Sequence, residues 1–157
     1  MPFCLGLHPG FNVPLDDEED FGDYVLTFER EETCDSPVLD PETGLVRTAA
    51  RRPVLENTRQ LPLCHELFAA DALVLENLRS RKVCLYSKHS GRGVEMNFDG
   101  FDFFGVWQPQ NAPFVCLEPW TGTATCDDED DLFAHKRGVK LLGPGEGCQL
   151  ACKITLL

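Results

Sequence analysis

Hydrophobic and polar residues alternate with a period of two in several short segments of the chain. The pattern covers residues 24–28, 94–98 and 114–117, and a shorter stretch at 83–85 follows it. This period is typical of a β-strand that buries one face and leaves the other in contact with water or another layer. We therefore predict strands at these four places.

The longest alternating stretch closes the chain at residues 148–156. Apolar or thiol-bearing side chains fill every second position, and these are Cys148, Leu150, Cys152, Ile154 and Leu156. The pattern predicts a strand with all five side chains against the core. A four-residue spacing of cysteines would also suit two ligands on one helical face, but the period of two favours small buried thiols.

Turn residues separate the predicted strands, and helical periodicity is scarce. Clusters of Gly, Pro, Asn and Asp occur at residues 40–44, 90–93, 108–113 and 143–145. One or two helical turns are predicted within 63–70 and again within 127–135. Short strands with frequent turns indicate an antiparallel sandwich or barrel. A length of 157 residues without a linker-like segment fits one domain over residues 1–157.

The charge balance argues against several classes of partner. The chain has 14 Lys and Arg against 26 Asp and Glu, which gives a formal net charge of −12. A chain this acidic repels phosphate groups, so we expect neither nucleic acid nor an anionic membrane surface as a partner. Three acidic runs, at 16–20, 29–32 and 127–131, are interpreted as solvated surface segments. The third lacks the ligand pattern of an EF-hand and is expected to cap a short helix.

Eight cysteines bear on the cellular compartment and on metal binding. None of them forms the C-x-x-C spacing of a zinc or redox motif, and the first residues carry no basic segment typical of a signal peptide. We therefore expect free thiols, no metal site and a cytoplasmic protein.

Two polar residues stand at the ends of apolar stretches. A polar residue at the end of a strand is well placed to line a cleft. His8 precedes Pro9, and Glu118 precedes Pro119 and Trp120. A proline cannot donate to a sheet ladder, so each stretch is expected to end there. The apolar segment before Trp107 is interpreted as a core strand. The other three histidines are expected to be structural or exposed, namely His65, His89 and His135.

Several motifs in order along the chain resemble the aldose 1-epimerase (galactose mutarotase-like) family, in the branch that includes the LacX proteins. The resemblance is carried by HPGFN at residues 8–12, FAADALVL at 68–75 and FVCLEPWTG at 114–122. KRGV at 136–139 and LGPGE at 142–146 also fit. Their order and spacing match the C-terminal part of that family.

The resemblance implies an all-β antiparallel sandwich and the interconversion of α and β anomers of aldoses such as galactose and glucose. It implies His8 as general acid, Glu118 as general base and Asp71 as a ligand of sugar hydroxyls. Trp120 is our addition, as a wall of the sugar pocket. Asp71 has an alternative structural interpretation as a cap of the segment that follows a helical turn. The reaction requires no metal or cofactor, and no cluster of Arg and Lys in the sequence argues for a phosphorylated sugar.

The family carries a substantial segment before its H-x-x-F-N motif, whereas that motif begins at residue 8 here. The chain is therefore expected to be a sandwich truncated at the N-terminus, without the family's sugar-binding Arg and a further His. Missing strands expose sheet edges, so self-association or a partner chain that covers them is expected. Two functions remain open: an active aldose 1-epimerase, or a non-catalytic carbohydrate-binding or remnant fragment.

Overall fold

The computed structural model describes all residues from 1 to 157, and nearly all of its regular structure is β. The strands are β1 (Pro2–Phe3), β2 (Gly10–Asn12), β3 (Tyr24–Leu39), β4 (Val46–Pro62), β5 (Leu73–Glu76), β6 (Lys82–Ser87), β7 (Gly93–Asn97), β8 (Phe103–Trp107), β9 (Phe114–Trp120), β10 (Lys140–Leu141) and β11 (Lys153–Leu156). Helical structure is limited to single 3₁₀ turns at Phe21–Asp23, His65–Phe68 and Phe133–His135. The all-β prediction is confirmed.

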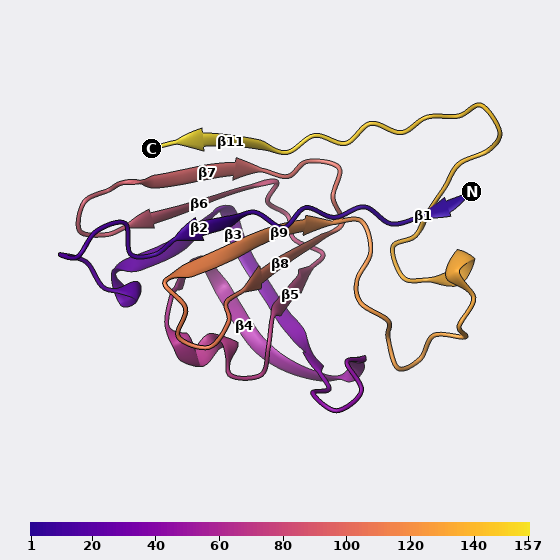
Figure 1. Cartoon of the computed structure of the whole chain (residues 1–157), viewed down its shortest axis with the longest axis horizontal. Coiled ribbons are helices and arrows are strands. Elements are labelled where there is room, and N and C mark those ends of the chain that lie inside the picture. Colours follow the sequence, from indigo (N-terminus) through magenta and orange to yellow (C-terminus); the bar gives the residue numbers. More distant parts are fainter.

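Two antiparallel sheets form the body of the molecule (Figure 1). One has the strand order β11-β7-β6-β3-β4, and the other has the order β2-β9-β8-β5. A small third sheet pairs β1 with β10. Because neighbouring strands run antiparallel throughout the named sheets, the antiparallel arrangement predicted from the turn pattern is confirmed.

The core lies between the inner faces of the two large sheets. Leu26 and Phe28 of β3 face it from one side, and Phe104 of β8 and Leu117 of β9 face it from the other. The rings of Phe98 and Phe104 lie 4.5 Å apart between their centroids. Each fully buried side chain of this kind contributes about 1.5–3 kcal/mol relative to its exposed state, so this layer stabilises the sandwich.

The hairpin of β3 and β4 extends past the sandwich (Figure 1). Its register shifts at several points, which is typical of β-bulges that bend a strand. In its far half the hydroxyl of Ser36 accepts a 2.9 Å hydrogen bond from the backbone N–H of Val74 in β5. The far half of the hairpin is therefore anchored beside the second sheet, and it carries Arg51 and Arg52 to that sheet's edge.

The closing strand is shorter than predicted, and its apolar side chains are not all in the core. Regular structure begins only at Lys153, and β11 pairs with β7 alone at the edge of its sheet. Leu150 and Cys152 pack against the core, but Cys148 is exposed and Leu156 is 83% exposed. The prediction of five core-facing positions is wrong because an edge strand has a neighbour on one side only and is not fully covered.

Two of the acidic runs contain a buried carboxylate, which corrects their interpretation as wholly solvated. Glu19 accepts hydrogen bonds from the hydroxyls of Tyr24 and Ser87, and Glu32 accepts them from Ser80. Both glutamates are buried. A carboxylate tolerates burial when donors replace its water. The donors Ser90, Tyr24 and Ser87 lower the pKa of Glu19 to about 2. The third run, 127–131, is exposed apart from the half-buried Glu129. Its predicted capping role is wrong, because the helical turn that follows starts at Phe133, has Leu132 at its N-cap position and has no side-chain cap.

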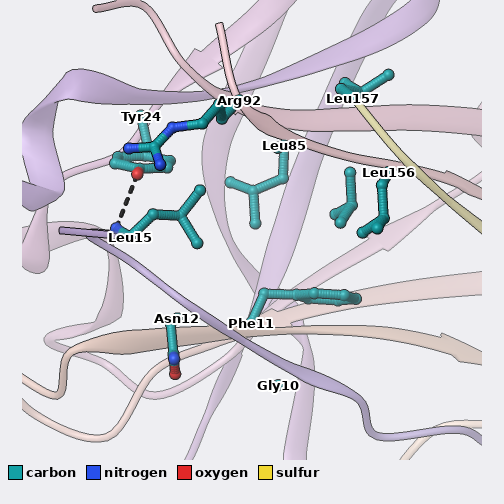
Figure 2. Close-up of a pocket in the computed structure, with 11 residues that line it drawn as sticks. Gly10, Phe11, Asn12, Leu15, Tyr24, Leu85, Arg92, Leu156 and Leu157 are labelled. Carbon is teal, nitrogen blue, oxygen red and sulfur yellow. Dashed lines mark hydrogen bonds between the residues drawn. The ribbon is translucent and has the colours of Figure 1, made fainter. Parts of the chain in front are cut away.

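An apolar cavity of about 450 Å³ opens between β2 and the five-stranded sheet. Figure 2 shows Phe11, Leu85 and Leu156 around it, while the side chain of Asn12 points away from it. The hydroxyl of Tyr24 at its edge is already engaged, since it accepts a hydrogen bond from the backbone N–H of Leu15 and donates one to Glu19. The cavity is therefore a loosely filled part of the sandwich and contains no acid–base pair. None of the helical turns of the protein has the length or apolar character needed to cross a membrane.

Candidate active site

The candidate site lies on the outer face of the sheet β2-β9-β8-β5. Side chains alternate along β9, so Val115 and Leu117 enter the core while Cys116 and Glu118 face outward. The pairing of β8 with β9 places Gly105 opposite Glu118, Trp107 opposite Cys116 and Phe103 opposite Trp120. The outer face thus gathers an acid, a thiol and two indoles in adjacent rows.

The segment before β2 carries His8 to the same place. Gly6 forms a bridge with Trp120, and Gly10 pairs with Cys116, so the register sets His8 opposite Glu118. The Nδ1 atom of His8 lies 3.2 Å from Oε1 of Glu118. The two residues that the family resemblance assigns to acid and base are therefore in direct contact, although they are far apart in the sequence.

The environments of the two groups differ. The side chain of Glu118 is 7% exposed, whereas that of His8 is 59% exposed. Burial raises the pKa of Glu118, the neighbouring His8 and the Trp120 side chain partly oppose this, and the negative charge of Asp71 adds to it. A raised pKa makes a carboxylate a stronger base than an ordinary glutamate. The imidazole of His8 is open to solvent.

Trp120 forms one wall of the site, and two glycines make its position possible. A Cβ atom added to Gly105 would lie 2.5 Å from two carbons of the indole, and one added to Gly6 would lie 2.7 Å from it. The half-buried indole therefore lies directly against both backbones, next to Glu118. An aromatic face in this place can stack on the C–H face of a sugar ring.

Trp107 is a second wall that the sequence did not indicate. It lies in β8 as predicted, but its side chain is only half buried and reaches His8. The two ring centroids are 5.7 Å apart with an interplanar angle of 76°, an edge-to-face contact. The core strand predicted for this segment is confirmed as β8, but Trp107 at its end lies outside the core cluster. The strand itself was evident from the sequence, but the pairing of β8 with β9 was needed to place Trp107 beside His8.

Asp71 is an exposed residue at a turn next to the site. Its φ of 67° is left-handed, and its own Oδ1 accepts a 2.7 Å hydrogen bond from the N–H of Ala72. This is the capping role that was the alternative to sugar binding. Asp71 also shares the wall of a cavity of about 490 Å³ with Trp107. Arg52 contacts the Asp71 carbonyl, and its Nε is buried without a hydrogen-bond partner.

A cluster of two arginines and an acid lies on the same outer face. The carboxylate of Glu76, which is 6% exposed, contacts Arg51 at 2.6 Å and Arg137 at 2.5 Å. Arg137 also lies over the ring of Phe103. The sequence did not indicate this cluster because its members come from three separate segments. Since Glu76 and Asp35 balance both arginines, the cluster does not favour a phosphate group.

Cys116 completes the central group of the site. Donor atoms of His8, Cys116 and Glu118 all lie within 4.8 Å of one another. Burial, together with the charge of Glu118, raises the pKa of the Cys116 thiol to about 11. The sequence offers one signal for this neighbour, because residues two apart on a strand share a face. No motif of metal ligands is visible in the linear sequence.

The chain is similar in sequence to proteins named LacX. It is 40% identical over its whole length to both the chromosomal and the plasmid LacX proteins of Lactococcus lactis subsp. lactis. It spans about half the length of these curated relatives, 53% of each. No protein-family model matches the chain.

Two solved structures share the fold over the entire chain. A galactose mutarotase related enzyme from Lactobacillus acidophilus superimposes with a TM-score of 0.89 at 31% identity, and the chain covers 52% of it. A galactose mutarotase-like protein from Lactobacillus casei superimposes with a TM-score of 0.80 at 28% identity, and 54% of it is covered. The resemblance to LacX proteins and the galactose mutarotase-like fold are thereby confirmed.

Proposed function

We propose that this LacX-related chain carries the acid–base pair of an aldose 1-epimerase, and that it interconverts the α and β anomers of free aldoses such as galactose and glucose. The observation that supports this most directly is the 3.2 Å contact of His8 with the buried carboxylate of Glu118. The similarity to galactose mutarotase-related proteins supports the same class of reaction.

The reaction needs one proton removed and another delivered at neighbouring oxygens. A base takes the proton of the anomeric hydroxyl while an acid protonates the ring oxygen, the C1–O5 bond breaks, and the aldehyde forms. Rotation about C1–C2 and closure on the other face give the second anomer. Both oxygens are bonded to C1, so the acid and the base must lie within a few ångströms of each other. His8 and Glu118 meet this requirement.

We assign the base to Glu118 because its raised pKa strengthens it as a proton acceptor. We assign the acid to His8 because a protonated imidazole can donate a proton through either ring nitrogen and the exposed ring of His8 can meet the sugar. The two then exchange roles when the ring closes. The indoles of Trp107 and Trp120 provide apolar walls, and Asp71 and Arg52 offer polar groups for hydroxyls at the side of the site.

Polarimetry of freshly dissolved α-galactose and α-glucose tests the proposal. The parent chain is expected to speed equilibration above the rate in buffer alone. A positioned acid or base contributes about 10²–10⁴ in rate, so Glu118→Gln should remove most of that acceleration. Glu56→Gln is the matched control, since Glu56 is an exposed glutamate on β4. If the folded parent does not exceed the buffer rate, the epimerase proposal fails, and a sugar titration then tests the non-catalytic alternative.

A further inference from the structure

We propose that His8, Cys116 and Glu118 form a binding site for a zinc ion. The sequence predicted no metal site, because none of these residues stands in a metal-binding motif. The fold brings one nitrogen, one sulfur and one oxygen donor together on the outer face of β9. This inference rests on the positions of the three side chains and does not require that the chain turns over a sugar.

The distances between donor atoms suit a small tetrahedral ion. Zinc binds nitrogen, oxygen and sulfur at about 2.0–2.3 Å, which separates neighbouring ligands by roughly 3.4 Å in a tetrahedron. The Nδ1 of His8 and the Oε1 of Glu118 are 3.2 Å apart, and all three donor atoms lie within 4.8 Å of one another.

The donor types select the ion. Imidazole and thiolate are ligands that zinc prefers, whereas calcium and magnesium take oxygen ligands in larger number. Three protein ligands leave the fourth tetrahedral position to water or another small ligand, as in open zinc sites. Zinc therefore fits this set better than calcium or magnesium does.

Two of the ligands are held firmly and the third is adjustable. Cys116 and Glu118 are buried residues of β9, which pairs with β8 along this stretch. Gly10, opposite Cys116, has no side chain to fill the space in front of the thiol. His8 lies in the exposed segment before β2 and contacts Trp107 at its edge. A rigid pair and an adjustable histidine allow an ion to enter without rearrangement of the sheet.

Zinc at this site would take the free lone pair of the His8 imidazole and one oxygen of the Glu118 carboxylate, so neither group could move a proton at a sugar. Metal binding and turnover of sugar would then exclude each other. This consequence, unlike the metal binding itself, rests on the proposed function. If both hold, zinc inhibits the anomeric interconversion, and Cys116→Ser relieves the inhibition while the acid and base stay in place.

Cobalt(II) provides a direct test with the full chain, because a thiolate bound to cobalt gives a near-ultraviolet charge-transfer band. We expect the band in the parent and its loss when zinc is added. Cys116→Ser should lose the band, and both Cys116→Ser and Glu118→Gln should weaken zinc binding by more than about tenfold. The double variant Cys64→Ser/Cys148→Ser removes two exposed thiols and should keep the band.

The proposal is overturned if the parent shows no thiolate band, if Cys116→Ser keeps it, or if the band disappears in the Cys64→Ser/Cys148→Ser variant. Circular dichroism of each variant establishes that the fold is retained. Should Cys116→Ser fail to fold, the zinc affinities of Glu118→Gln and His8→Ala are compared with that of the parent instead, and both should be weaker. Polarimetry is a separate readout. It distinguishes a chain that binds zinc but does not turn over sugar from a chain that turns over sugar but does not bind zinc.

Discussion

The indole of Trp120 lies against the backbone of Gly105, where a Cβ atom would approach two ring carbons to 2.5 Å. Gly105 is paired with Glu118 across β8 and β9, so this close approach occurs beside the proposed base. Gly105→Ala is expected to displace the indole while the sheet keeps its hydrogen bonds. Because Trp120 is a wall of the site, the variant should raise KM in the polarimetric assay. Its melting temperature should fall only slightly.

The matched control for this variant is Gly147→Ala. A Cβ atom at Gly147 meets nothing within 4 Å, and the residue lies in the segment before β11. It should leave both KM and the melting temperature close to those of the parent. Equal KM values for Gly105→Ala and the parent would contradict the role of Trp120 as a wall of the sugar site.

The pH dependence of the reaction should report on Glu118. Its pKa is raised from the ordinary value of 4.5, mainly by burial, and a general base works only when it has lost its proton. Activity should therefore fall as the pH drops through this raised pKa, at a pH above 4.5. The profile of kcat/KM against pH measures this limb for the free enzyme. A limb at or below 4.5 would argue against a buried base.

Glu118→Gln should remove activity without lowering stability. The pKa of Glu118 is raised in the fold, so ionisation of this group lowers the free energy of unfolding and protonation restores it. The contribution to stability is present at low pH and is lost as the pH rises through the folded pKa. A neutral glutamine of the same shape avoids that loss, so its melting temperature at neutral pH should equal or exceed that of the parent. A markedly lower melting temperature would show that the carboxylate is needed for folding.

Asp71→Asn separates the two roles considered for Asp71. Asparagine tolerates the left-handed φ of 67° and keeps an oxygen for the hydrogen bond to Ala72, so stability should not change. If the charge of Asp71 serves the site, KM should rise and the acid limb set by Glu118 should shift to lower pH, because one cause of its raised pKa is removed. Unchanged kinetics together with unchanged stability would leave Asp71 with the capping role alone.

Local patterns along the chain predicted most of the fold. Period-two alternation located β7, β9 and the first half of β3, since alternate side chains of each strand face a single core. The motifs around His8 and Glu118 identified the pair that the structure places in contact. The strands depend on neighbouring residues in the sequence, and the acid–base pair was identified from motifs, so both could be predicted from the sequence alone.

Features that depend on pairing between distant segments were missed. Trp107 belongs to an apolar run, and only the register with β9 reveals that it faces His8. Glu32 belongs to an acidic run, and only the approach of Ser80 shows why it is buried. The strand expected from residue 148 starts at Lys153 because an alternating pattern needs a neighbouring strand to pair with, and β7 ends at Asn97 opposite Lys153.

The buried carboxylate of Glu32 should contribute measurably to stability. It accepts hydrogen bonds from the backbone N–H of Arg79, and from both the N–H and the hydroxyl of Ser80, at 2.6–3.1 Å. Glu32→Ala leaves these donors without a partner in a site that is 3% exposed. Loss of a buried acceptor costs about 1–3 kcal/mol, so the urea midpoint should fall with little change in the m-value. The exposed neighbour Glu31 provides the control. The free energy of unfolding of Glu31→Ala should lie within about 0.5 kcal/mol of that of the parent. Equal midpoints for the two alanine variants would contradict a structural role for Glu32. Because Glu32 lies on β3 and Glu118 on β9 of the other sheet, we expect unchanged kinetics at temperatures where the Glu32→Ala variant stays folded.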